Sequence, residues 1–285
     1  MELGFTLPNN WGIDDIGGVV ALAAQAEAAG YTSVWVKHHV LNVGYVGERL
    51  GDGPYHDALT VLTAAATSTE QVRLGTSVLV LPYLHPMVLA KQLATLDQLS
   101  GGRVVAGVGV GSLPEENAAL GVGYDDRGRY SDESIEVMRQ LWSHHPPSFS
   151  GAYFDLDGQV ASPKPAQDHL PLYVGGNRPP ALRRVAAIAD GWHPLGPSPE
   201  GLVERLERLD AELDQRGRSR SDIVVSVRLD VGRARKASEE YVELFGAYGE
   251  AGADELVLSI SSPDLDLQRS TLERLAAEVL PSLTQ

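Results

Sequence analysis

The chain has 285 residues and carries 38 aspartates and glutamates against 23 lysines and arginines. The resulting formal net charge of −15 predicts no nucleic-acid partner, because phosphate binding needs a basic face. The absence of cysteine excludes thiol nucleophiles, iron–sulfur clusters and disulfides, and with neither an apolar run of about 18 residues nor a secretory signal in view, we expect a cytoplasmic protein with no membrane partner.

Eight apolar segments rich in valine and leucine recur along the chain, and each is followed by an amphipathic stretch. The predicted strands are Leu3–Leu7, Ser33–Val36, Val72–Leu81, Arg103–Val110, Pro171–Val174, Asp190–Trp192, Ile223–Leu229 and Glu255–Ile260. The predicted helices are Ile16–Ala29, Ala58–Ser68, Val88–Leu99, Ser131–Trp142, Ala181–Ala189, Leu202–Arg216, Glu239–Ala251 and Leu272–Leu280. This alternation requires parallel strands covered by helices, either as an open doubly wound sheet or as a closed barrel. Eight units in this length fit a single (β/α)8 TIM barrel over residues 1–285.

The regular spacing breaks once, near residues 148–165. Turn residues and aromatic side chains alternate there, which is typical of a short β-hairpin. We therefore predict a hairpin insertion within the barrel domain. The loop that follows Phe149 and the glycine-containing loop Leu41–Tyr55 are candidate lids, although an ordinary mobile loop fits the second equally well.

Functional groups of such barrels lie at the carboxyl ends of the strands. His38 and His39 come directly after the second predicted strand. Neighbouring residues of an extended segment point to opposite sides, so a two-histidine metal site is disfavoured, and we predict no metal. A single histidine at this place is either structural or a proton carrier that works near neutral pH.

Three later strand ends are also candidates. The run Gly107-Val-Gly-Val-Gly-Ser112 has glycines at alternate positions, which clear one face for a flat ligand or for another backbone. Gly175-Gly176-Asn177 precedes a helix that starts with prolines, so the free N–H groups there predict a phosphate site, with a plain turn as the alternative. His193, after the sixth strand, faces the barrel mouth or caps a loop.

No nucleophile elbow, catalytic triad or phosphate-binding loop is recognisable in the sequence. Glycine-cleared walls, a phosphate site and one or two histidines fit a flat phosphorylated cofactor that brings its own chemistry.

Taken in order, these motifs resemble the luciferase-like monooxygenase superfamily of flavin- and deazaflavin-dependent barrels. The resemblance extends over nearly the whole chain through the segments Glu27–His39, Arg73–Val78, Asp97–Arg103, Gly107–Gly111, Pro171–Gly176 and Asp190–Trp192. The compact length and the Gly-Trp-His-Pro ending of the sixth strand are more similar to coenzyme F420 enzymes than to the longer FMN-dependent members.

The resemblance implies an F420-dependent oxidoreductase that transfers hydride between the deazaflavin ring and a small organic substrate, with His39 as proton donor or acceptor. It also implies a cis peptide bond between Ser77 and Val78 that backs the ring. The residues that it implies in cofactor binding are His38, Thr76, Ser77, Val78, Gly109, Val110, Gly111, Ser112, Gly175, Gly176, Asn177, Trp192 and His193. Members are commonly homodimers, and a flavin or F420 reductase is expected as a functional partner.

The chain departs from the family pattern at Ser112, where the deazaflavin sugar dehydrogenases carry an acid, so a glutamate proton donor and a sugar-phosphate substrate are not carried over. We interpret Glu115 and Glu116 as favourable charges of a first helical turn. Two other functions stay open: an FMN-dependent two-component monooxygenase supplied with reduced flavin by a reductase, and a noncatalytic flavin-binding barrel.

Overall fold

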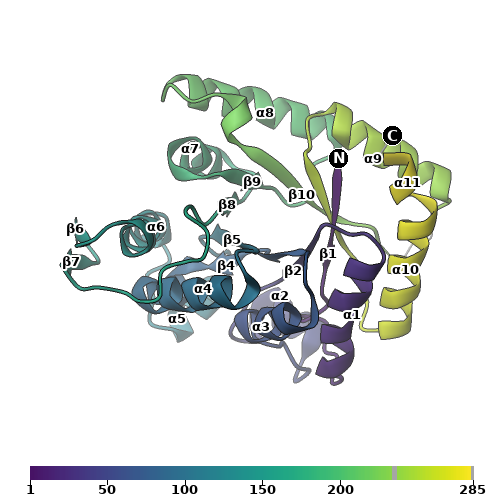
Figure 1. Cartoon of the computed structure of the whole chain (residues 1–285), viewed down its shortest axis with the longest axis horizontal. Helices are drawn as coiled ribbons and strands as arrows, with labels where there is room; N and C mark the ends of the chain where they lie inside the picture. The colour runs from purple at the N-terminus through teal and green to yellow at the C-terminus, as the bar shows by residue number, and fades with distance from the viewer. Residues whose placement is uncertain (233–235, 284–285) are drawn as a thin grey trace.

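Parallel strands close into a barrel, and helices cover its outside (Figure 1). This computed structural model describes residues 1–232 and 236–283. The barrel strands are β1 (Glu2–Thr6), β2 (Ser33–Val36), β3 (Arg73–Thr76), β4 (Leu79–Val80), β5 (Val104–Gly109), β8 (Leu172–Gly175), β9 (Gly191–His193), β10 (Val224–Asp230) and β11 (Glu255–Ser259). The ring runs β1-β2-β3-β5-β8-β9-β10-β11 and closes because β11 pairs with β1, every pair being parallel. The predicted (β/α)8 fold class is confirmed.

The helical layer packs against the barrel through leucine, valine and alanine side chains. Its helices are α1 (Ile16–Ala28), α2 (Gly44–Leu50), α3 (Ala58–Ser68), α4 (Pro86–Ser100), α5 (Pro114–Ala119), α6 (Arg127–Ser143), α7 (Pro179–Ile188), α8 (Pro199–Asp214), α9 (Ser238–Glu250), α10 (Leu265–Glu278) and α11 (Leu280–Leu283), with short 3-10 turns at Leu81–Tyr83 and Arg220–Asp222. In the described part of the chain, no helix combines the length and the apolar character that crossing a membrane requires.

The third predicted strand, Val72–Leu81, is divided in the structure. β3 ends at Thr76 and β4 begins at Leu79, and the peptide bond between the intervening Ser77 and Val78 is cis, as the family resemblance implied. β4 continues the same position in the ring and pairs with β5. We call the segment Ser77–Val78 between β3 and β4 the bulge. The Ser77 N–H donates to the Val36 carbonyl at 2.7 Å, so the bulge stays hydrogen-bonded to the neighbouring β2.

Several helices begin earlier than the sequence predicted, α6 and α10 by the most, and helix α2 was not predicted. α6 begins at Arg127 and α10 at Leu265, both earlier than expected; Asp264 caps α10 by accepting the first-turn N–H groups of Asp266 and Leu267 at 2.9 and 3.1 Å. α2 lies inside the loop Leu41–Tyr55. The glycines of this segment lower its helix propensity, so the sequence pattern did not indicate a helix there.

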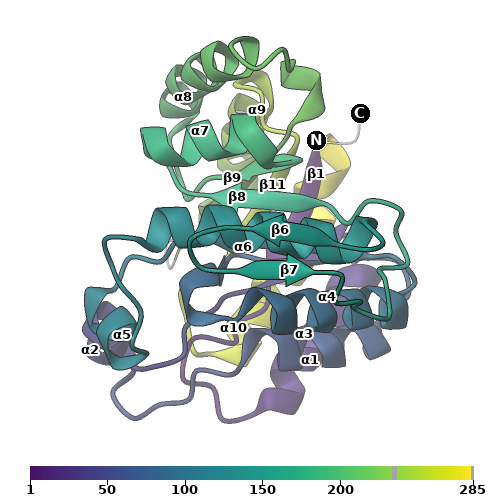
Figure 2. The ribbon, with the colours of Figure 1, turned by 90° about the vertical axis from the view of Figure 1, so that its left-hand side faces the viewer.

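The predicted insertion is a hairpin of β6 (Ser148–Ser150) and β7 (Asp155–Asp157). Figure 2 shows it outside the helical layer, across α6. Glu133 of α6 holds its turn by accepting the N–H groups of Ala152 and Tyr153 at 2.9 and 2.8 Å. The hairpin packs on α6 and contributes no residue to the lining of the pocket described below.

The backbones of β3 and β5 approach each other very closely at Gly107. A Cβ atom on Gly107 would lie 1.8 Å from the Thr76 carbonyl oxygen. We predict that Gly107→Ala lowers the free energy of unfolding by about 3 kcal/mol or more, because the two strands would have to separate. Gly246→Ala on α9 is the control. Outside its own stretch of helix, no atom of the described residues lies within 4 Å of the added carbon, so the change should be neutral or stabilise by about 0.5–1 kcal/mol. Urea unfolding measures both, and a Gly107→Ala protein as stable as the wild type would contradict this packing.

Candidate active site

A pocket of about 360 Å³ opens at the carboxyl ends of the barrel strands, a volume in the range that holds small ligands. The predicted residues that line it are His38, His39, Ser77, Val78, Gly109, Val110, Gly111, Ser112, Gly175, Gly176 and His193. Lining residues that sequence reasoning did not select are Asn10, Lys37, Tyr45, Arg49, Tyr55, Val80, Pro194, Leu195 and Arg228. The pocket thus joins most of the predicted residues to a second set that is more polar and more basic.

The bulge at Ser77–Val78 forms one wall of this pocket. A Cβ on Gly109 would lie 2.7 Å from a methyl carbon of Val78, and one on Gly175 would lie 3.0 Å from the other. Val78 therefore sits between two strands that have no side chains at these positions. The consequence is a smooth apolar surface that faces the pocket, suited to a flat ring.

His39 lies between a carboxylate and a phenol. Its Nδ1 is 2.7 Å from Oε2 of Glu116, and its Nε2 is 2.9 Å from the Tyr45 hydroxyl. Because the carboxylate can only accept, His39 carries a proton on Nδ1, and Nε2 is the ring nitrogen beside the Tyr45 hydroxyl.

Glu116 corrects the interpretation of the two acids that begin α5. Glu115 is exposed, as a first-turn charge would be, but Glu116 is fully buried. It accepts the Val40 and Leu41 N–H groups at 2.6 and 3.0 Å in addition to His39. Burial alone would raise the pKa of this carboxyl, but these hydrogen bonds outweigh it and hold the pKa below its ordinary value. Glu116 therefore fixes both the tautomer of His39 and the loop that follows it.

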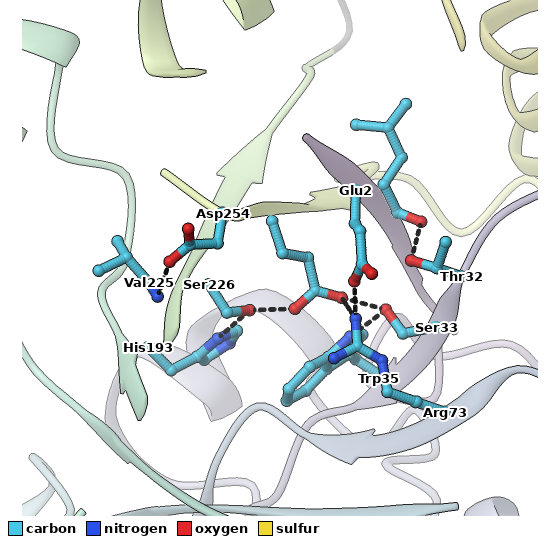
Figure 3. Close-up of polar contacts among 11 residues, drawn as sticks. Glu2, Thr32, Ser33, Trp35, Arg73, His193, Val225, Ser226 and Asp254 are labelled. Carbon is cyan, nitrogen blue, oxygen red and sulfur yellow. Dashed lines mark hydrogen bonds and ion pairs between the residues drawn. The ribbon is translucent and has the colours of Figure 1, made fainter. Parts of the chain in front are cut away.

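His193 sits in a chain of buried side chains that runs down the barrel interior (Figure 3). Ser226 donates to Oε2 of Glu255 at 2.6 Å, so its oxygen accepts the proton on Nδ1 of His193, 3.1 Å away. The Ser77 hydroxyl then donates to Nε2 of His193 at 2.8 Å. At the far end Glu255 also accepts from Ser33. The chain thus connects the bulge to the opposite end of the barrel.

Both buried histidines of the site are held in the neutral form. Burial, and next the charge of Arg228, lower the pKa of His193 to about 3. Burial lowers the pKa of His38 to about 4, and its Nδ1 accepts the Val80 N–H at 3.2 Å. The imidazole of His193 also stacks on Trp35, with ring centroids 4.7 Å apart. These two histidines act as neutral hydrogen-bonding groups in the wall of the pocket.

Three predicted cofactor residues do not line the pocket. Thr76 donates to the Gly107 carbonyl at 2.7 Å, and the buried Trp192 donates to the Gly176 carbonyl at 2.8 Å. Asn177 donates to the Leu195 carbonyl at 2.7 Å and accepts the Leu195 N–H at 3.2 Å, which ties two adjacent loops together. The backbone N–H groups of residues 176–178 have no hydrogen-bond partner among the described residues.

A comparison with known protein families identifies the class. The luciferase-like monooxygenase family matches residues 1–279, and the chain belongs to this family. An uncharacterised protein of Mycobacterium tuberculosis is 35% identical over 207 residues, which are 68% of this chain and 71% of that protein. An F420-dependent glucose-6-phosphate dehydrogenase of Microbacterium testaceum is 34% identical over 204 residues, 70% of this chain but 59% of the dehydrogenase.

Solved structures agree on the fold. An F420-dependent secondary alcohol dehydrogenase in complex with an F420-acetone adduct superposes with a TM-score of 0.84, at 21% identity over 99% of this chain and 98% of that one. The FMN complex of the oxygenating constituent of 3,6-diketocamphane monooxygenase from Pseudomonas putida has a TM-score of 0.77, at 18% identity over 99% and 98% of the two chains.

The neutral state of His193 predicts how stability depends on pH. An unfolded histidine takes up a proton near pH 6.5, whereas folded His193 does so only near pH 3. The folded state therefore loses stability as the pH falls from about 6.5, by up to about 1.4 kcal/mol per pH unit for one such group. His193→Gln, which removes this group, should lose less stability between pH 6.5 and pH 4 than the wild type does. Urea unfolding across this range measures the two slopes, and equal slopes would refute a buried neutral His193.

Proposed function

We propose that the protein is an F420-dependent oxidoreductase that transfers hydride between the deazaflavin ring and a small organic substrate. The observation that carries the proposal is the union, in one pocket, of the smooth Val78 wall and the His39–Glu116 pair. Family membership and the F420-dependent relative support it.

The residues present fit such a cofactor. Gly109 and Gly175 leave room for a ring against Val78. The unpartnered N–H groups of residues 176–178, just before α7, offer donors to a phosphate. When bound, the cofactor supplies a ring carbon that accepts or gives up hydride.

The chain itself has to manage the proton that accompanies the hydride. In the oxidation of an alcohol, hydride leaves the carbon and the hydroxyl proton goes to Nε2 of His39. Glu116 stabilises the resulting imidazolium through the proton on Nδ1. In the reverse direction the same Nε2 returns the proton to the substrate oxygen.

The choice of cofactor is tested by titrating the purified protein with F420 and with FMN and following binding by fluorescence. We expect saturable F420 binding in the micromolar range and much weaker binding of FMN. Micromolar FMN binding without F420 binding would favour the two-component monooxygenase; the FMN-bound structural neighbour is the oxygenating constituent of a monooxygenase.

A substitution at Asn177 tests the predicted position of the cofactor phosphate. Asn177→Asp puts a carboxylate beside the predicted phosphate and should weaken F420 binding about tenfold more than Asn177→Ala does, which corresponds to about 1.4 kcal/mol. Both variants lose the Asn177 side-chain donor to Leu195. Only the aspartate keeps an acceptor for the Leu195 N–H, which favours the aspartate variant, so weaker F420 binding by that variant would reflect its charge. Equal affinities would place the phosphate elsewhere.

The catalytic pair is tested by kinetics with secondary alcohols and glucose 6-phosphate, the compounds that relatives and neighbours suggest. His39→Ala should slow hydride transfer by about 10²–10⁴-fold without changing F420 affinity, because it removes general acid–base catalysis. Glu116→Gln should slow it by a smaller factor. Glu115→Gln, the exposed neighbour, is the matched control. If neither the wild type nor His39→Ala turns over any of these substrates, the result would support the noncatalytic alternative.

We also propose that residues 1–285 form one domain, that the protein is a homodimer in the cytoplasm, and that an F420 reductase works with it. These proposals rest on the family resemblance, and light scattering of the purified protein measures the oligomeric state.

A further inference from the structure

Three cationic side chains line the pocket, those of Lys37, Arg49 and Arg228. Arg49 is already engaged, because it donates to the Asn10 carbonyl and stacks on the Trp11 ring. Lys37 follows β2, and Arg228 lies near the end of β10. Around the barrel β2 and β10 flank β1 and β11, whereas the glycine-rich ends of β5 and β8 lie on the opposite half of the ring. Lys37 therefore starts across the barrel mouth from the proposed cofactor wall, whereas the Arg228 side chain reaches that wall at Ser77.

In the described part of the chain no carboxylate lies within ion-pairing distance of Lys37 or Arg228, although the charge of Asp230 favours the protonated form of both. Nζ of Lys37 donates to the Ser259 hydroxyl at 2.8 Å, and neither Lys37 nor Arg228 forms an ion pair among the described residues. Asp230, also on β10, uses its carboxylate on Ser261 and on the Gly232 N–H. Burial, and next the charge of Arg228, lower the pKa of Lys37 to about 7. Near neutral pH Lys37 is therefore only partly protonated, and an anion bound beside it would favour the charged ammonium form.

Arg228 keeps one edge of its guanidinium free. Its Nη1 donates to the carbonyl oxygen of Ser77 at 2.6 Å and to the Ser77 hydroxyl at 3.1 Å. Nε and Nη2 have no hydrogen-bond partner among the described residues. This pair of N–H groups is the edge that binds two oxygens of a carboxylate or phosphate side by side. The hydroxyl of Tyr55, which also lines the pocket, has no partner in the described part of the chain either.

We propose that the substrate carries an anionic group, a carboxylate or a phosphate monoester, which binds between Lys37 and the free edge of Arg228. The proposal rests on the proposed function, because it places the reacting carbon of that substrate between this anion subsite and His39. Both groups of this subsite are side chains at strand ends, so it is separate from the backbone N–H groups before α7.

Binding of simple anions to the F420-saturated protein tests the subsite. Isothermal titration with inorganic phosphate and with acetate should give saturable binding, and Lys37→Met should weaken it at least tenfold while leaving F420 affinity unchanged. If Lys37→Met does not fold, Lys37→Gln takes its place. Lys91→Met, an exposed lysine on α4 outside this pocket, is the matched control and should bind anions like the wild type.

Three results of this titration would overturn the anion subsite, and failure of F420 to bind would overturn the proposed function instead. No saturable binding to the holoenzyme, or equal binding by the wild type and Lys37→Met, removes the subsite. Binding that disappears when F420 is added assigns the anion to the cofactor's own phosphate position. If F420 itself does not bind, the proposed function fails, and the same Lys37→Met comparison on the free protein still decides whether the anion subsite exists.

Kinetics test the substrate class. Among alcohols of similar size, hydroxy acids and phosphorylated alcohols should have lower KM values than neutral alcohols. Lys37→Met should raise KM about tenfold or more for the anionic compounds and leave KM for the neutral ones unchanged. A variant that raises both equally would show that Lys37 is structural.

Discussion

The architecture of the pocket depends on one close contact, that of Val78 with the backbones of two neighbouring strands. Val78 can occupy its position only because Gly109 on β5 and Gly175 on β8 have no Cβ atoms. At the level of the bulge the barrel wall is therefore made of backbone and two methyl groups. A wall of this kind can support a planar molecule over its whole face, which longer side chains at the same positions would prevent.

The polar half of the pocket depends on a different constraint, the need to satisfy buried hydrogen-bonding groups. Glu255 is fully buried and accepts from Ser226 and Ser33, and Ser226 in turn orients His193. Each group has its donor and acceptor roles set by its neighbour, so the tautomer of His193 follows from a carboxylate deep in the barrel. Such fully connected networks hold a single arrangement, because a change in one member leaves another unpaired at a cost of about 1–3 kcal/mol.

Much of this could be predicted from the sequence, and the omissions have physical reasons. The alternation of apolar and amphipathic segments predicted the barrel, and glycine spacing at residues 107–111 and 175–176 predicted where backbone would be exposed. Glu116 was misinterpreted because first-turn acids are common, and only the fold brings it to His39. Arg228 lies within the predicted strand Ile223–Leu229, so a search of the residues after each strand passed over it. The sequence did contain an indication of this residue's role, because a charged side chain within a mostly apolar barrel strand needs polar groups or a ligand to contact.

Arg228 also joins the two halves of the pocket. One nitrogen of its guanidinium grips the Ser77 bulge, and the opposite edge of the same rigid plane is open. A planar group cannot rotate at one edge and stay still at the other. If an anion at the open edge shifts this plane, it also shifts the bulge, and thermodynamic reciprocity then requires that the anion and a ligand on the bulge alter each other's affinity by the same factor.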